Sequence, residues 1–298
     1  MKKKKFRFKQ EFSWFLFIVP AVVIYFIVTV IPTLETIGYS FTNFNGLSID
    51  FDFVGLHNYI KMFKNEDAIQ SIANSVIYGF TVPVLVTVLA IPLALALNSN
   101  IKCKNILRAI FFFPSVISTL FIGYIWKFIL SSSSMGLING IRVAQGKDTL
   151  ALLADTKIAM ILMILVAVWS SVGWHACIYI ANLQTISGDY YEAAYLDGAT
   201  PFQRFRYITF PMLAPAMTSS VLLLLTGSLK AYDLPFALTG GGPGHATTMI
   251  TQTIIDEGVT SNQVGYASSM SFMFLIIICV VSMIQTTYMN RRERKLYE

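Results

Sequence analysis

Charged residues are scarce in this sequence. They make up 13% of its 298 residues, whereas 55% of the residues are hydrophobic. A soluble globular domain carries about 25% charged residues, so the composition excludes an ordinary soluble domain and predicts a membrane protein. The net charge is +6, but the basic residues cluster at the ends of apolar segments, so we expect no nucleic-acid partner.

Cysteine is also rare. The three cysteines, Cys103, Cys177 and Cys279, are odd in number and lie far apart. The sequence has no CxxC pair and no cysteine at ligand-like spacing from a histidine, which argues against a disulfide framework and a cysteine metal centre. We predict reduced, packed thiols and no metal site.

The sequence lacks the motifs of nucleotide-hydrolysing and hydrolytic enzymes. It contains no GxxxxGK[ST], no HExxH and no GxSxG. The glycine-rich stretch 238–248 lacks the GKS or GKT ending that binds phosphate, so we predict a flexible outer turn there. The chain is therefore not predicted to be an enzyme, and it cannot hydrolyse ATP in the P-loop manner by itself.

Long apolar runs dominate what is present, and roughly twenty residues suffice to cross a bilayer. Six runs qualify, over residues 12–32, 74–97, 109–130, 158–181, 213–231 and 264–288. The first run could imitate a signal peptide, but its core is too long and no small-x-small cleavage site follows, so we expect an uncleaved anchor. We predict an all-α membrane protein with six transmembrane helices, in which prolines mark kinks.

The positions of the basic residues predict the orientation of these spans. Most of the 22 Lys and Arg residues fall in segments on the same side as the N-terminus, which indicates that this side is cytoplasmic. We predict a cytoplasmic basic tail over residues 1–11, a transmembrane domain over 12–288 and a cytoplasmic C-terminal tail over 289–298. The polar insert 187–215 then lies on the cytoplasmic side.

The insert 187–215 carries the start and stop signals of two short helices. Ser187 can cap the first helix, and Asp189 and Glu192 lie in its first turn, where carboxylates are favoured by the helix dipole. Gly198 can end this helix in a left-handed conformation. We predict a sharp turn at Gly198.

A second helix is predicted directly after this turn. Thr200 is its expected N-cap, Pro201 occupies the first position, and Gln203 completes a capping box. Pro211 and Pro215 are expected to end it.

The same insert resembles a known loop. Its string Glu192-Ala193-Ala194, then Gly198, then Ile208-Thr209-Phe210-Pro211 is similar to the EAA loop of ABC-importer permeases, and EAAYLDGATPFQRFRYITFP is most similar to the carbohydrate branch of that family. Phe210 replaces the usual Leu, and Ser187 stands where Pro is common. An ordinary amphipathic loop helix is the alternative, but a match over twenty residues with fixed spacing favours the family.

The resemblance implies a type I ABC-importer permease fold and uptake of a sugar or oligosaccharide by alternating access, in a bacterial-type inner membrane. It implies four kinds of partner besides the lipid bilayer: a second permease subunit, two ATP-binding cassette ATPase subunits, an extracellular solute-binding protein and a carbohydrate solute. No cofactor is expected in this chain, because the ATPase subunits bind ATP. Residues matched to the ATPase-coupling motif are Glu192, Ala193, Ala194, Asp197, Gly198, Arg204, Ile208 and Pro211.

The fourth and fifth apolar runs contain candidates for solute contact. Small residues at helical spacing usually mean close helix packing, and Lys230 and Asp233 could simply pair with each other. The functional alternative is a cavity in which an aromatic face covers a sugar ring and polar groups bind its hydroxyls. The candidates are Trp169, Ser170, Gly173, Trp174, Ser228, Lys230, Tyr232 and Asp233.

Two other transport functions remain open. A permease for glycerol phosphate or another polar solute would share the same architecture. A secondary transporter without an ATPase would show inverted repeats and ionisable residues at the membrane midplane, and neither signature is visible.

Overall fold

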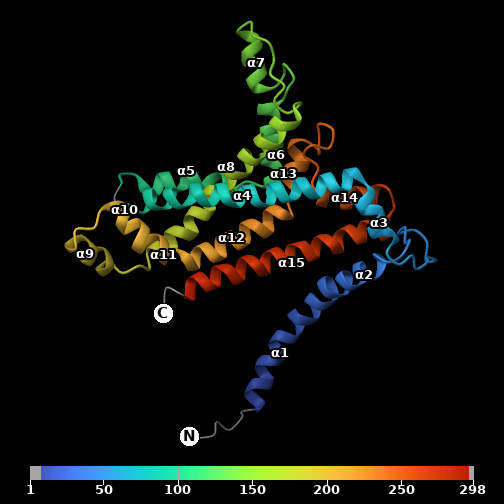
Figure 1. The fold of residues 1–298 in the computed structure, drawn as a ribbon, viewed down its shortest axis with the longest axis horizontal. Coiled ribbons are helices and arrows are strands. Elements are labelled where there is room, and N and C mark those ends of the chain that lie inside the picture. The colour runs from blue at the N-terminus through green and yellow to red at the C-terminus, as the bar shows by residue number, and fades with distance from the viewer. Residues whose placement is uncertain (1–7, 100, 295–298) are drawn as a thin grey trace. The chain divides into compact units, whose positions relative to one another are not determined.

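The computed structural model describes residues 8–99 and 101–294 and is shown in Figure 1. Residues 1–7 and 295–298, which hold most of the predicted N-terminal tail and the end of the predicted C-terminal tail, lie outside the described residues. Within the described ranges the chain is helical, and the β pairing is one isolated antiparallel bridge between Thr42 and Phe53. Contacts divide the chain into two units, residues 1–64 with 254–273 and residues 65–253 with 274–298.

The first unit begins with a long apolar helix. Its elements before residue 65 are α1 (Phe8–Tyr25), the π-helix η1 (Phe26–Val30), α2 (Ile31–Tyr39) and α3 (His57–Lys64). Gly55 has a φ of +58°, and helix α3 begins two residues later. Asn58 is buried and its amide donates to the carbonyls of Ser40 and Thr42, at 3.0 and 2.8 Å, which fixes the loop between α2 and α3.

The second unit holds most of the other helices. These are α4 (Glu66–Asn98), α5 (Lys104–Val116), α6 (Thr119–Leu130), α7 (Leu137–Ala144), α8 (Thr156–Leu183), α9 (Asp189–Leu196), α10 (Pro201–Arg204), η2 (Phe205–Thr209), α11 (Phe210–Met212), α12 (Ala214–Leu229) and α13 (Asp233–Leu238). Figure 1 shows α9 and α10 at one end of the long helices and α13 toward the other. Further elements are α14 (Ile250–Ile255), η3 (Asp256–Thr260) and α15 (Val264–Arg294).

The membrane spans agree in number with the six apolar runs if each bent pair is counted as one. Four helices of the described chain are long and apolar enough to cross a membrane, and two bent helix pairs raise the number to six. The four continuous spans are Leu16–Tyr39, Glu66–Asn98, Thr156–Leu183 and Val264–Arg291. Helix α1 begins at Phe8 and α15 ends at Arg294, so helix extends into both predicted tails.

One predicted span is not a single helix. The apolar run 109–130 consists of α5 and α6, which meet at 95°. The backbone at Ile117 and Ser118 is non-helical, with ψ of 138° and 132°. Pro114, one turn earlier, has no N–H to donate, so the helix is already weakened there. The run 109–130 is therefore a bent span, and hydropathy alone, which records apolarity and not direction, does not predict the 95° change of direction.

Helices α4, α8 and α12 form the core of the second unit. The most deeply buried apolar side chains on these helices include Val86, Met163, Tyr179 and Leu229. In a bilayer the lipid tails are as apolar as these side chains, so close packing rather than hydrophobic transfer holds such helices together. Gly79 allows this approach, because an added Cβ would lie 2.4 Å from the side chain of Leu229.

Two local predictions need correction or refinement. All three cysteines are free, as expected, but Cys103 and Cys279 are exposed rather than packed, and Cys177 is only partly buried.

The glycine-rich stretch 238–248 does form turns, yet it is tied to α4. The buried Asn74 amide donates to the carbonyls of His245 and Thr248, each at 3.0 Å.

Candidate functional site

Two helix breaks open onto one cavity in the second unit. The cavity has a volume of about 460 Å³ and is lined by residues of both the α5–α6 break and the α12–α13 break, together with α4 and α8. Non-helical backbone at membrane depth is tolerated where it lines a water-filled cavity, and transporters commonly bind solutes at such broken helices. The cavity is therefore the candidate solute site.

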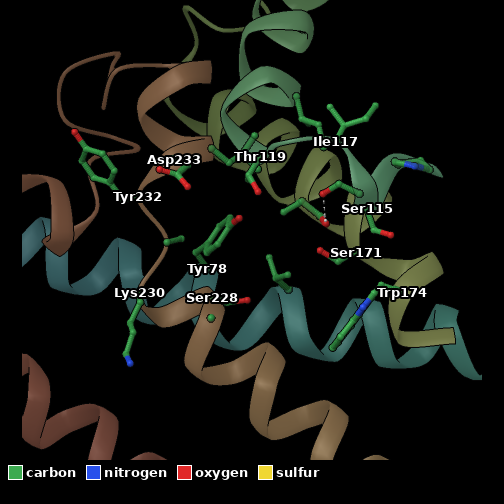
Figure 2. Close-up of a pocket in the computed structure, with 18 of the residues that line it drawn as sticks. Tyr78, Ser115, Ile117, Thr119, Ser171, Trp174, Ser228, Lys230, Tyr232 and Asp233 are labelled. Carbon is green, nitrogen blue, oxygen red and sulfur yellow. Dashed lines mark hydrogen bonds between the residues drawn. The ribbon is translucent and has the colours of Figure 1, made fainter. Parts of the chain in front are cut away.

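Six of the eight predicted solute-contact residues line this cavity: Ser170, Trp174, Ser228, Lys230, Tyr232 and Asp233. Figure 2 shows Trp174 on one side and Tyr232 with Asp233 on the other, with Ser228 between them. These residues come from α8, the end of α12, the break and the start of α13. The structure thus brings together residues that are up to about sixty positions apart in sequence.

Gly173 lies outside this cavity. A Cβ added at Gly173 would lie 1.8 Å from the carbonyl oxygen of Phe111, so α8 and α5 touch backbone to backbone there. Helix packing accounts for this small residue.

Trp169 also lies outside the cavity. Its ring packs edge to face on Trp126, with ring centroids 5.5 Å apart, in an apolar recess beside Phe111 and Val172. Its environment is that of a lipid-facing or packing residue.

Trp174 is held at the cavity wall by its neighbour. The ring is 40% exposed and packs edge to face against His175, with centroids 4.7 Å apart. His175 is buried, and its Nδ1 lies 2.8 Å from Ser220 Oγ. This polar contact fixes the histidine ring, which leaves an ordered aromatic face toward the cavity.

Lys230 and Asp233 do not pair, so the interpretation of a self-neutralising couple was wrong. Helix α12 ends at Leu229 and α13 begins at Asp233, which places the two residues on opposite sides of a break rather than one turn apart on one helix. In the described chain neither side chain makes a hydrogen bond or ion pair. Figure 2 shows the Lys230 side chain directed away from Asp233.

The insert 187–215 folds largely as its local signals predict. Thr200 caps α10, its N–H donates to Gln203 Oε1 at 2.7 Å, and the N–H of Gln203 donates to Thr200 Oγ1 at 3.3 Å. Gly198 has a φ of +75°. The cap of α9 is shifted by one residue: Gly188 is the N-cap, and Ser187 Oγ accepts from the N–H of Asp189 at 3.3 Å.

The second helix of the insert ends at Met212, between the two prolines, as expected. The backbone stays helical through η2 and α11 and bends by 65° where α12 begins at Ala214. Pro211 and Pro215 lie in the first turns of α11 and α12. The missing N–H of Pro215 is tolerated, because the bend before α12 leaves that position without an intrahelical partner.

The insert presents a surface rich in aromatic side chains. Glu192 and Arg204 line one shallow depression with Tyr191, Tyr195 and Leu196, and Leu196 is 85% exposed. Large apolar groups exposed together on a loop commonly mark a protein contact. Of the other predicted coupling residues, Ala193, Asp197 and Gly198 are exposed, whereas Ala194, Ile208 and Pro211 are partly buried.

Comparison with known families identifies the fold. Residues 86–295 match the model of the family described as "Binding-protein-dependent transport system inner membrane component". The chain belongs to this family. It is therefore a membrane-embedded permease component of a transport system and not an enzyme, and the recognition made from the insert 187–215 is confirmed.

Individual relatives cover nearly the whole permease. The chain is 31% identical to a probable starch degradation products transport system permease protein of Thermoanaerobacterium thermosulfurigenes, over 98% of each chain. It is 34% identical to a multiple sugar-binding transport system permease protein of Streptococcus mutans, over 93% of this chain and 94% of the relative. A solved bacterial alginate ABC transporter, in complex with a periplasmic protein that binds alginate pentasaccharide, gives a TM-score of 0.78 at 20% identity, over 97% and 96% of the chains. This structural match confirms the predicted type I importer fold.

Several polar residues of the permease cavity were missed from the sequence. Tyr78, Ser115, Thr119 and Ser171 also line it. Ser115 and Thr119 flank the α5–α6 break, which the continuous apolar run conceals. A search for hydroxyl residues next to proline inside an apolar run could have found Ser115, which follows Pro114.

Proposed function

We propose that this permease carries a sugar or oligosaccharide across a cell membrane through the cavity between the two helix breaks. The observation that carries the proposal is the combination of the Trp174 face with hydroxyl groups such as Ser171, Thr119 and Ser228 in one cavity. An aromatic face covers the apolar face of a sugar ring, and hydroxyl groups exchange hydrogen bonds with its polar edge. The volume lies within the roughly 300–1,000 Å³ range of ligand sites.

The names of the relatives support a carbohydrate solute, since they refer to starch degradation products and to multiple sugars. The unpaired Lys230 favours a second candidate, an anionic solute such as glycerol phosphate, whose charge it could neutralise. Asp233, which is equally unpaired in the same cavity, opposes a strongly anionic solute. We therefore favour a neutral sugar.

Energy would come from outside this chain. In the proposed mechanism two ATPase subunits bind the insert 187–215 and hold the ATP, a second permease subunit completes the pathway, and an extracellular solute-binding protein delivers the solute. Closure of the ATPase pair moves the insert, and the helix bundle alternates between inward and outward openings. In this mechanism ATP binds only to the ATPase subunits and does not contact the permease.

The complex purified with its neighbouring gene products provides the test of the solute. Its ATPase activity in lipid nanodiscs would be measured with the solute-binding protein and either neutral oligosaccharides or glycerol phosphate. Stimulation by neutral oligosaccharides is expected, because Lys230 and Asp233 together leave the cavity without net charge. Stimulation by glycerol phosphate alone would support the second candidate.

Replacing Trp174 with alanine is expected to weaken uptake by about 1 kcal/mol, or roughly fivefold, because the stacking surface for the sugar ring is lost. Trp169→Ala is the matched control, since Trp169 lies on the same helix with similar exposure, 46% against 40%, but outside the cavity. Initial uptake rates at equal membrane levels would be compared. Equal loss in both variants would assign Trp174 to packing rather than to solute contact.

The proposed orientation places both termini and the insert in the cytoplasm. Single cysteines at Ala144 and Gln203, both exposed, in a chain without its native cysteines should then react with an impermeant thiol reagent from opposite sides. Labelling of intact cells should modify position 144 and spare position 203. Modification of both from outside would contradict the topology.

A further inference from the structure

We propose that Tyr191 is a positioning residue that transmits movement of the docking helix α9 to the cavity helix α12, through its hydrogen bond with Thr209. This inference rests on the proposed function of the insert 187–215. The Tyr191 hydroxyl lies 3.0 Å from Thr209 Oγ1. This side-chain hydrogen bond joins α9 directly to the segment 201–213, which leads into α12.

The direction of this hydrogen bond follows from the second partner of Thr209. Thr209 Oγ1 also lies 3.4 Å from the carbonyl oxygen of Arg204, to which it donates. A threonine hydroxyl has one proton and two lone pairs. Because that proton is used on Arg204, the Tyr191 O–H donates to Thr209.

Thr209 is well placed to receive a displacement. It is 5% exposed, at the end of the π-helix η2, so the side chain cannot move independently of its surroundings. Its carbonyl accepts the N–H of Leu213 at 3.0 Å. Leu213 is fully buried and lies where α11 gives way to α12. Thr209 therefore contacts the docking helix α9 through its side chain and the start of the transmembrane helix α12 through its backbone.

Helix α9 is only loosely packed against the rest of the chain. None of its residues is buried, and Tyr190 and Tyr195 are 54% and 71% exposed. Packing alone therefore resists sliding of α9 only weakly. The other end of the pathway lies on α12, which carries Ser228 into the cavity.

The test uses a reporter cysteine in the cavity. Gly227 lies on α12, lines the cavity and has no atom within 4 Å of an added Cβ, so Gly227→Cys should be tolerated. In the full complex, with the native cysteines replaced, the rate of labelling by a methanethiosulfonate ethylammonium reagent would be measured with and without ATP and vanadate. The ratio of the two rates reports how far nucleotide trapping changes access to the cavity.

Tyr191→Phe removes one hydroxyl and keeps the ring. We expect it to reduce the nucleotide-dependent ratio by about fivefold, the effect of one ordinary hydrogen bond, while the ATPase subunits still co-purify. Thr209→Val also removes the hydrogen bond and should reduce the ratio by a similar factor. Thr209→Ser keeps the hydroxyl and should retain the ratio. Tyr190→Phe is the matched control, because Tyr190 lies on the same helix but outside the depression, and its hydroxyl makes no hydrogen bond within the described chain.

Two results would overturn this inference and leave the proposed function unaffected. One is an equal nucleotide-dependent ratio in the Tyr191→Phe and Tyr190→Phe variants. The other is loss of ATPase co-purification with Tyr191→Phe, because Tyr191 would then act at the docking surface itself. If the Gly227→Cys permease with native Tyr191 is labelled at the same rate with and without ATP and vanadate, the ATP-driven function is overturned and this inference with it.

Discussion

Replacing Gly198 with valine is expected to reduce co-purification of the ATPase subunits by about tenfold or more and to abolish uptake. Gly198 has a φ of +75°, a conformation that costs a non-glycine residue about 1–3 kcal/mol and a β-branched residue more. The turn between α9 and α10 would open to relieve this strain and displace the proposed docking surface. Membrane levels should stay normal, because a Cβ at Gly198 meets no atom within 4 Å.

Two matched variants separate backbone strain from added bulk. Gly188→Val places the same side chain at the start of α9, where φ is −58° and an added Cβ has no atom within 4 Å, and it should keep ATPase association. Gly198→Asn adds bulk but tolerates a positive φ, and it should keep most of the association. Pull-down of the ATPase subunit from detergent extracts measures both. Full association in Gly198→Val would contradict the role assigned to the insert 187–215.

Gly173→Ala is expected to destabilise the folded permease by about 3 kcal/mol or more, at the upper end of overpacking effects. The added methyl group would lie 1.8 Å from the Phe111 carbonyl oxygen, and backbone cannot rotate away as a flexible side chain can. The gain of about 1 kcal/mol in helix propensity is too small to compensate. The thermal unfolding midpoint in detergent and the level of the permease in membranes would be measured, and both should be lower than in the unaltered permease.

Gly227→Ala is the control for this prediction. Both glycines lie inside long helices, but the Cβ of the control variant has no neighbour within 4 Å. Its unfolding midpoint should be unchanged or slightly raised. An equal midpoint in Gly173→Ala and the unaltered permease would show that α5 and α8 can separate without cost.

The parts of the fold that the sequence predicts well depend on short-range signals. Thr200 and Gln203 are three residues apart, and their mutual hydrogen bonds follow from that spacing alone. Gly198 takes its left-handed conformation for a reason equally local. Most turns and caps of the insert 187–215 could therefore be predicted residue by residue.

The cavity could be predicted only in part, because it depends on long-range packing. Trp174 and Ser228 lie on different helices, and nothing in their spacing indicates that they face one space. Trp169 and Trp174 are equally plausible aromatic candidates in sequence, and only the packing of α8 against α5 at Gly173 decides which one faces inward. The break after Leu229 separates Lys230 from Asp233, which helical spacing alone would have paired.

The charged groups of the cavity stand apart from the hydrogen bonds and ion pairs that hold the fold together, and its tryptophan keeps much of its surface free. Lys230 and Asp233 are exposed side chains without ion pairs in the described chain, and Trp174 is 40% exposed. Most surface-like substitutions change stability by less than about 0.5 kcal/mol. Substitutions at these positions can therefore accumulate during evolution without a folding penalty, so a change of nutrient would need few mutations and no rebuilding of the bundle.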